Sequence, residues 1–388
     1  MRRYITLTIA CIAIIGMIVY LEIQKPRRLD SEIQTIAITP AAPAKNATSS
    51  PITASEDRSA ILKEKKAAHE PAKELSGIQG YINTDSFTLA DLVGKKVMLV
   101  DFWTYSCINC QRTTPYLNMW YEKYNDKGLV IVGVHTPEFE FEKNYDNVAK
   151  AVKQADIMYP VVLDNNYGTW NAYHNLYWPH KYLIDIDGYI VYDHIGEGRY
   201  TETEKKIQEL LEERKAVLGV NKEISREISA PAEIIEIDPA MSRSPEIYFG
   251  ASRNVRLGNG EANRTGVQHL PEPNNIKPHT LYLVGDWDIQ NEFAENKSKN
   301  AKIIFRYQGK NVYMVAAQTP DSLPLKVIRD GKPLDIMADG KDAKADFLYI
   351  SPEERLYHVI DDRAGWGEHT LEIIIENPGL RIFTFTFG

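Results

Sequence analysis

Cysteine is scarce in this chain of 388 residues, which contains only three: Cys11, Cys107 and Cys110. A fold held together by disulfides would need more cysteines, spread along the chain. Cys11 lies inside an apolar stretch, so the rest of the chain contains one close pair, in the segment Cys-Ile-Asn-Cys. A pair this close would close a very small loop and add little stability as a cross-link. We therefore interpret Cys107 and Cys110 as a redox-active pair.

The sequence also lacks an excess of basic residues. It has 45 Lys and Arg against 53 Asp and Glu, for a formal net charge of -8. Nucleic-acid binding needs a basic patch or stripe, so we expect no nucleic-acid partner. A metal site needs more ligands than two cysteines, and no second cysteine pair exists. We therefore expect no metal and no bound cofactor beyond a redox-active disulfide between Cys107 and Cys110.

One long apolar run follows Arg2 and Arg3 and covers residues 4–23. About 20 predominantly apolar residues can cross a bilayer as a helix, and flanking positive charges stay on the cytoplasmic side. Residues 1–23 are therefore predicted to be a single-pass anchor in a bacterial inner (cytoplasmic) membrane, with the soluble domains on the periplasmic or extracytoplasmic side. A cleaved signal peptide is the alternative, but the run ends without the small residues of a cleavage site.

Composition divides the remainder into four segments. Residues 24–76 are rich in Ala, Pro, Ser and charged residues, which predicts a disordered spacer with at most a short helix around residues 59–68. Residues 77–218 alternate strand-like and helix-like stretches, which predicts an α/β domain with a mixed sheet. A polar connector covers residues 219–239. Residues 240–388 contain many short strands separated by turns, which predicts an all-β sandwich or jelly roll.

The position of the cysteine pair assigns a role to each sulfur. Cys107 stands between the nearly continuous apolar run 97–103, a predicted buried strand, and a helical stretch. Unpaired N–H groups and the dipole at a helix start favour a thiolate there, and the thiolate is the attacking species. Cys110, one helical turn further, is placed to resolve the mixed disulfide.

The segment Val100–Cys110 resembles the active-site stretch of the thioredoxin superfamily. The resemblance implies a thioredoxin-like fold and a catalytic role for Asp101, the family's buried acid, as proton acceptor for the resolving cysteine. A carboxylate buried in an apolar strand has a raised pKa, which suits proton exchange near neutrality. Trp103 matches the tryptophan beside the family's site, although it is also a natural core residue.

Two prolines extend the same resemblance. Pro115 matches the proline that kinks the family's active-site helix, as an internal proline would. Trp178 and Pro179 match the cis-proline loop that faces the cysteines and offers backbone groups to an extended substrate.

His135 begins an insertion that borders the site. Its side chain could act as a catalytic base or could only form local hydrogen bonds, and we weigh the two roles against each other.

A closer resemblance is to the extracytoplasmic part of the DipZ family. It implies a thioredoxin-like domain followed by a β-sandwich like a carbohydrate-binding module. Family members often carry an electron-conducting domain of several membrane helices, whereas this sequence has one apolar span. A separate, CcdA-like membrane electron donor is therefore expected. The matching stretches are residues 103–110, 132–139, 177–179, 182–185, 244–250 and 383–388.

Three functions remain open from the sequence. The leading one is a membrane-anchored thiol–disulfide oxidoreductase that reduces disulfides in extracytoplasmic proteins. A thiol-dependent peroxidase is the second, because Thr104 and Cys107 fit a Thr-x-x-Cys signature, although Val100 stands where that signature has proline. The third is an envelope adaptor that binds glycans or proteins through residues 240–388, where Trp287 and Trp366 are candidates for stacking on sugar rings.

Overall fold

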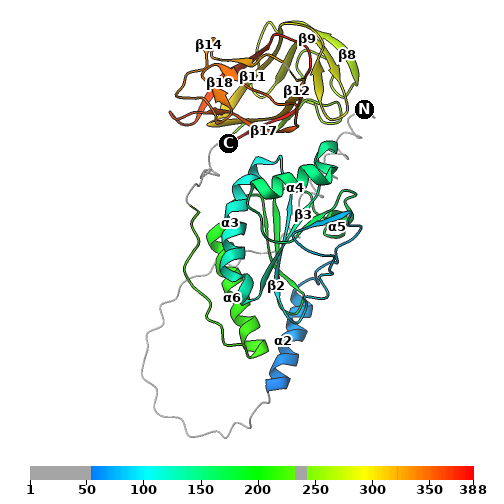
Figure 1. Ribbon diagram of the computed structural model, residues 1–388, viewed down its shortest axis with the longest axis vertical. Helices are drawn as coiled ribbons and strands as arrows, with labels where there is room; N and C mark the ends of the chain where they lie inside the picture. Colours follow the sequence, from blue (N-terminus) through cyan, green and yellow to red (C-terminus); the bar gives the residue numbers. More distant parts are fainter. Residues whose placement is uncertain (1–53, 232–242, 321) are drawn as a thin grey trace, which may run out of the picture. The chain divides into compact units, whose positions relative to one another are not determined.

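The computed structural model describes residues 54–231, 243–320 and 322–388, which form an α/β region and a β region (Figure 1). The predicted membrane anchor and most of the predicted spacer lie outside these residues. Within the described ranges, no helix is long and apolar enough to cross a membrane.

The α/β region is built on a six-stranded sheet with the order β1-β4-β3-β2-β5-β6. Strands β2, β3 and β4 run parallel to one another, and the other pairings are antiparallel. Strand β2 is buried at every position, as expected of a strand covered on both faces. This mixed sheet confirms the expected thioredoxin-like fold. The strands are β1 (Gly80–Ile82), β2 (Val97–Trp103), β3 (Leu129–His135), β4 (Val161–Leu163), β5 (His180–Ile184) and β6 (Ile190–Ile195).

Helices cover both faces of this sheet. One apolar cluster contains residues from α3, α4 and α6, and Figure 1 shows α3 and α6 side by side. A second cluster contains Trp170 of α5 and the residues of β2 that alternate with those of the first. The helices are α2 (Ala54–Ala68), α3 (Ile108–Tyr124), α4 (Tyr145–Gln154), α5 (Gly168–Ala172) and α6 (Tyr200–Leu218), with 3-10 helices η1 (Asn125–Lys127) and η2 (Glu140–Lys143).

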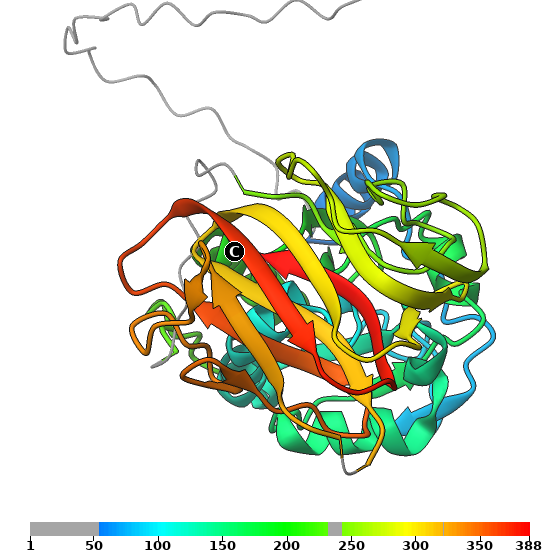
Figure 2. The ribbon, with the colours of Figure 1, turned by 90° about the horizontal axis from the view of Figure 1, so that it is seen from above.

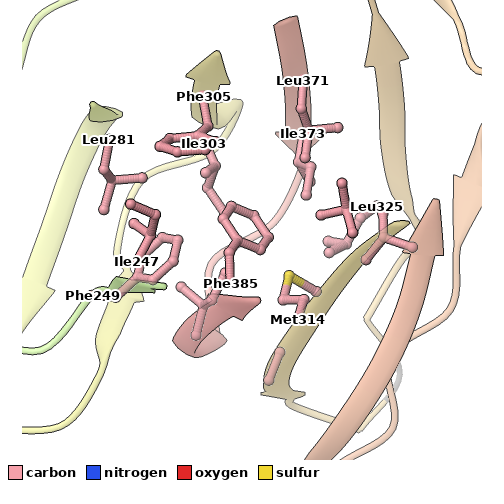
Figure 3. Close-up of a cluster of buried hydrophobic side chains, with 14 of the residues drawn as sticks. Ile247, Phe249, Leu281, Ile303, Phe305, Met314, Leu325, Leu371, Ile373 and Phe385 are labelled. Atoms are coloured by element: carbon pink, nitrogen blue, oxygen red, sulfur yellow. The ribbon is translucent and has the colours of Figure 1, made fainter. Parts of the chain in front are cut away.

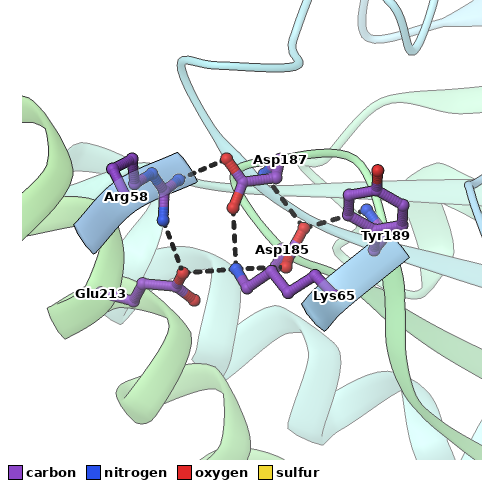
Figure 4. A network of polar contacts seen from close by, with 6 residues as sticks. All are labelled: Arg58, Lys65, Asp185, Asp187, Tyr189 and Glu213. Atoms are coloured by element: carbon purple, nitrogen blue, oxygen red, sulfur yellow. Dashed lines mark hydrogen bonds and ion pairs between the residues drawn. The ribbon is translucent and has the colours of Figure 1, made fainter. Parts of the chain in front are cut away.

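The folded region begins earlier than the sequence predicted. Helix α2 lies within the segment expected to be spacer, and its Lys65 contacts the buried carboxylate of Asp185 at 2.6 Å and that of Asp187 at 2.8 Å (Figure 4). Glu213 of α6 and Arg58 of α2 complete this network. Residues 69–76 continue along the same surface, where the backbone N–H of residue 72 donates to the carbonyl of residue 188. Ion pairs between distant segments, which local composition does not reveal, order this stretch.

The β region is a 13-stranded sheet that is nearly closed (Figure 2). Its main path is β15-β16-β13-β18-β11-β9-β10-β19-β12-β17, and a bridge between Asp339 and Ile360 brings the two ends together. The strands are β7 (Ile247–Tyr248), β8 (Gly266–Leu270), β9 (Leu281–Ile289), β10 (Ala294–Asn296), β11 (Ala301–Gly309), β12 (Asn311–Gln318), β13 (Leu325–Arg329), β14 (Lys332–Pro333), β15 (Ala343–Lys344), β16 (Phe347–Leu348), β17 (Arg355–Asp361), β18 (Gly367–Ile375) and β19 (Leu380–Phe387).

An apolar core fills this sheet. Phe249, Phe305 and Phe385 are fully buried there, with Leu and Ile side chains from the facing strands (Figure 3). Trp287 belongs to the same core, and its ring N–H donates to the carbonyl of Val284 at 3.0 Å. Trp287 is therefore a packing residue, and its ring is not available for stacking on a sugar.

Residues from the insertion after β3 contact the β region. Phe139 is buried against Phe383, with ring centroids 5.2 Å apart. Glu138 accepts hydrogen bonds from the Arg253 guanidinium at 2.8 Å and from the Tyr248 hydroxyl at 2.9 Å. The start of the insertion is thus held by both apolar and charged contacts.

Candidate active site

Cys107 and Cys110 differ in access to solvent. Cys107 caps the N-terminus of α3 in an extended conformation and is partly exposed. Cys110 lies one turn into the helix and is buried, with 2% of its surface accessible. Only Cys107 can therefore meet a bulky disulfide substrate, which fits its predicted role as the attacking sulfur.

The loop opposite the cysteines has the conformation that the resemblance implied. The peptide bond between Trp178 and Pro179 is cis, and the carbonyl oxygen of Trp178 lies 4.0 Å from the Sγ of Cys107. The ring N–H of Trp178 donates to the carbonyl of Thr136 at 3.0 Å. The N–H of Gly196 donates to the Pro179 carbonyl at 2.7 Å. These bonds fix the loop beside the attacking sulfur.

Trp103 and Pro115 also lie where the resemblance implied. Pro115 is internal to α3. Trp103 is almost fully buried and meets the ring of His135 edge to face, at 5.1 Å between centroids. A Cβ atom on Gly133 would lie 2.9 Å from the Trp103 ring nitrogen. Glycine at this position therefore makes room for the indole under the site.

His135 has no access to solvent or substrate. Its side chain is fully buried, and its Nε2 lies 3.4 Å from the Thr104 hydroxyl. Burial lowers its pKa to about 3, so the imidazole stays neutral. The ring also stacks on Tyr105, with centroids 5.7 Å apart. These contacts favour the packing role over that of a catalytic base.

Asp101 is buried in the middle of β2 on the face that carries Cys110. Burial raises its pKa to about 7, and a nearby lysine, Lys181, acts in the opposite direction. Its Oδ1 has no hydrogen-bond partner among the described residues. Burial also raises the pKa of the Cys110 thiol, to which the neighbouring Cys107 and the charge of Asp101 contribute. Asp101 is therefore suited to exchanging a proton near neutral pH.

Sequence reasoning missed Lys181, which lies beside Asp101. The two residues are direct partners across β2 and β5, and Lys181 is fully buried. A lysine among apolar residues in a predicted strand was the available signal. The relevance of Lys181 depends on its pairing with Asp101, and this strand register is visible only in the folded sheet.

Glu142 of η2 was also missed as a site residue. Its carboxylate is fully buried and accepts a 2.6 Å hydrogen bond from the Ser106 hydroxyl and one from the Phe139 N–H at 3.0 Å. Since Ser106 precedes Cys107, this carboxylate supports the turn that presents the attacking sulfur.

An ion pair connects the active-site helix to the loop after β6. The Arg112 guanidinium donates to both carboxylate oxygens of Glu197, at 2.7 and 2.9 Å, and to the side chain of Asn109 at 2.7 Å. Paired hydrogen bonds of this kind fix orientation as well as distance. They therefore hold the loop in place next to the cysteine pair.

Comparisons with known proteins agree with this geometry. Residues 69–193 match the family model described as the AhpC/TSA family, and residues 244–388 match that of a thioredoxin-like C-terminal domain. The protein DipZ of Mycobacterium bovis is 38% identical over 319 residues, which cover 82% of this chain and 43% of DipZ. The chain therefore aligns with less than half the length of this relative.

Two shorter relatives match the α/β region. Thiol-disulfide oxidoreductase ResA of Bacillus cereus is 33% identical over 135 residues, which cover 32% of this chain and 75% of ResA. Thiol-disulfide oxidoreductase YkuV of Bacillus subtilis is 29% identical over 144 residues, which cover 37% of this chain and 96% of YkuV. With its cysteine pair and cis-proline loop, the chain belongs to the thioredoxin-like family of thiol–disulfide oxidoreductases.

Proposed function

We propose that this protein is a thiol–disulfide oxidoreductase that reduces disulfides in extracytoplasmic proteins. The observation that carries the proposal is the arrangement of a partly exposed Cys107, a buried Cys110 and the Trp178 carbonyl 4.0 Å from the outer sulfur. An extended peptide that carries a disulfide would lie along the cis-proline loop, where it meets Cys107 first.

The chemistry proceeds in two exchanges. The thiolate of Cys107 attacks a substrate disulfide and forms a mixed disulfide, and one substrate thiolate leaves. Cys110 then loses its proton to Asp101 and attacks the Sγ of Cys107, which releases the second substrate thiol. The cysteine pair is oxidised by two electrons and the substrate is reduced by two. A reductant must restore the pair before the next cycle.

The reductant for the cysteine pair would be a membrane protein. Residues 4–23 would anchor the chain as a single span in the bacterial inner membrane, with the cysteine pair on the periplasmic side. A CcdA-like membrane protein would donate the electrons. Labelling of Cys107 by a membrane-impermeant thiol reagent in intact spheroplasts tests this location. Protection of Cys107 until the membrane is broken would contradict it.

Trapping of the mixed disulfide tests the chemistry. In the full-length Cys110→Ser variant, Cys107 should stay bonded to its substrate, and the complex should separate on adding dithiothreitol. The Cys107→Ser variant should trap nothing at the active site because the thiol of Cys110 is buried. Trapping by both variants would contradict the assigned order.

Three measurements separate disulfide reduction from disulfide oxidation and from peroxide turnover. The wild-type protein should reduce insulin disulfides, and both cysteine variants should fail. Its reduction potential should lie near the thioredoxin value of about -270 mV, whereas about -120 mV would indicate an oxidant. Turnover of hydrogen peroxide faster than that of insulin would favour the peroxidase alternative.

A further inference from the structure

Lys181 is the one lysine in the described part of the chain whose side chain is fully buried. Burying an ammonium group is costly unless nearby charge or hydrogen bonds compensate. Its Nζ donates to the carbonyl of Gly196 at 2.9 Å, which is a neutral acceptor. No carboxylate of the described residues lies within ion-pair distance, so the charge requires a partner at longer range.

Asp101 is the carboxylate that the sheet places next to this lysine. Strand β2 has two neighbours, and the register pairs Asp101 with Gly133 on β3 and with Lys181 on β5. Gly133 has no side chain. Directly opposed residues of adjacent strands project from the same face of a sheet. Lys181 is therefore the charged residue that flanks Asp101 within the sheet.

The other titratable groups around this pair do not supply a second cation. Cys107, Cys110 and Tyr159 are neutral when protonated, and Tyr200 places its ring 5.8 Å from the lysine Nζ. Arg112 is already paired with Glu197. The charges of Cys110 from α3 and Glu197 from the loop after β6 act on Lys181, while the charges of the pair act on Tyr159 before β4, His180 of β5 and His194 of β6. Burial lowers the pKa of both histidines, which favours their neutral forms.

We propose that Lys181 is a positioning residue whose buried ammonium favours the ionised form of Asp101, so that Asp101 can take the proton of Cys110 during resolution. The proposal rests on the proposed disulfide exchange. During that step the Cys110 proton moves to the carboxylate, the bond between the two cysteine sulfurs forms, and the bond from Cys107 to the substrate sulfur breaks. The departing thiolate takes a proton from water, and Lys181 gains or loses nothing.

The electrostatic environment agrees with this role. Burial raises the pKa of Asp101 and lowers that of Lys181, while each charge favours the charged form of the other. Removing the ammonium would leave Asp101 protonated at neutral pH. Resolution would then require a higher pH.

The test uses four full-length variants: Lys181→Met, Lys181→Arg, Asp101→Asn and the double variant Lys181→Met with Asp101→Asn. A mixed disulfide between Cys107 and thionitrobenzoate is formed on each, and release of the coloured thiol by Cys110 is timed by stopped flow from pH 5 to 10. Lys181→Met should slow release about tenfold at pH 7 and raise the midpoint of the pH profile by about one unit. Lys181→Arg should restore the wild-type midpoint.

The double variant separates electrostatics from structure, because Lys181 also holds the Gly196 carbonyl. In the Asp101→Asn background, Lys181→Met should leave the pH profile unchanged. The proposal would be overturned if Lys181→Met shifted the midpoint of the pH profile as much in the Asp101→Asn background as in the wild type. An unchanged midpoint in the Lys181→Met single variant would overturn it as well. Should the Lys181→Met variant fail to fold, Lys181→Gln replaces it in the test. Glutamine is neutral and keeps an N–H donor, so the same results are expected.

The small-molecule assay also keeps this inference separate from the proposed function. Thiol release measures the Cys110 step whether or not a protein substrate is known. Failure of the wild-type protein to reduce any protein disulfide would contradict the proposed function, while the pH profile would still decide the role of Lys181.

Discussion

The Ser106 hydroxyl donates a 2.6 Å hydrogen bond to the carboxylate of Glu142, and this bond connects the active-site turn to the insertion after β3. The same carboxylate accepts the N–H groups of Glu138, at 2.6 Å, and of Phe139, at 3.0 Å. A single buried side chain therefore holds both the residue before Cys107 and the segment that contacts the β region.

Replacing Glu142 by Gln should loosen this turn. Glutamine has one acceptor oxygen where the carboxylate has two, so its NH2 group would face an existing donor. We expect a loss of about 2 kcal/mol in the free energy of unfolding and about tenfold slower insulin reduction, because small displacements of reacting atoms are costly. Urea unfolding and the insulin assay measure the two effects. Exposed Glu140 provides the control Glu140→Gln, and equal losses in both variants would contradict a specific role for Glu142.

Asp101 should make stability depend on pH. Its pKa in the folded protein is about 7, against an ordinary value of 3.8. The folded state therefore holds the proton more tightly than the unfolded chain, and the stability from this proton is lost as pH rises from about 4 through 7. The Asp101→Asn variant has no carboxyl group at this position, so its stability should not fall in this way as pH rises. We expect it to match the wild type near pH 4 and to exceed it by about 2 kcal/mol or more at pH 8.

Urea unfolding of the reduced proteins at several pH values checks this expectation. The control is Asp146→Asn, at an exposed position on α4, which should show no such divergence. A difference between Asp101→Asn and wild type that stays constant from pH 4 to 8 would show that the carboxyl group does not titrate in this window.

Sequence predicts those elements of the fold whose residues show a clear local pattern of apolar and polar side chains. The run at residues 97–103 is apolar except for Asp101 and forms β2 at the predicted bounds, and the cysteine pair follows it closely. The three-residue strand β1 was not predicted because it is too short for a periodic pattern. Ile224 lies in the predicted polar connector but is buried in the α/β core. The pairing of Lys181 with Asp101 joins residues 80 positions apart, and no local signal specifies that register.

Helix α2 depends on Lys65 for its attachment. The ammonium of Lys65 contacts Asp185, whose carboxylate has no exposed surface. Removing the partner of a buried charge is strongly destabilising, so Lys65→Met should cost about 3 kcal/mol and should increase amide hydrogen exchange throughout α2. The neighbouring Lys66 is exposed, and Lys66→Met should change neither quantity. Unchanged exchange in α2 of the Lys65 variant would show that other contacts hold the helix.

Arg253 should couple unfolding of the β region to that of the α/β region. Its guanidinium lies 3.7 Å from the centre of the Tyr248 ring and donates to Glu138 at 2.8 Å. Without this charge, Glu138 and the exposed Glu246 would repel each other, because both carboxylates accept hydrogen bonds from the Tyr248 hydroxyl and so lie close together. We expect Arg253→Met to lose about 1–2 kcal/mol and to split one calorimetric transition into two. Exposed Arg256 gives the control Arg256→Met. A single transition at the wild-type temperature in both variants would show that the apolar contact of Phe139 with Phe383 is sufficient for coupling.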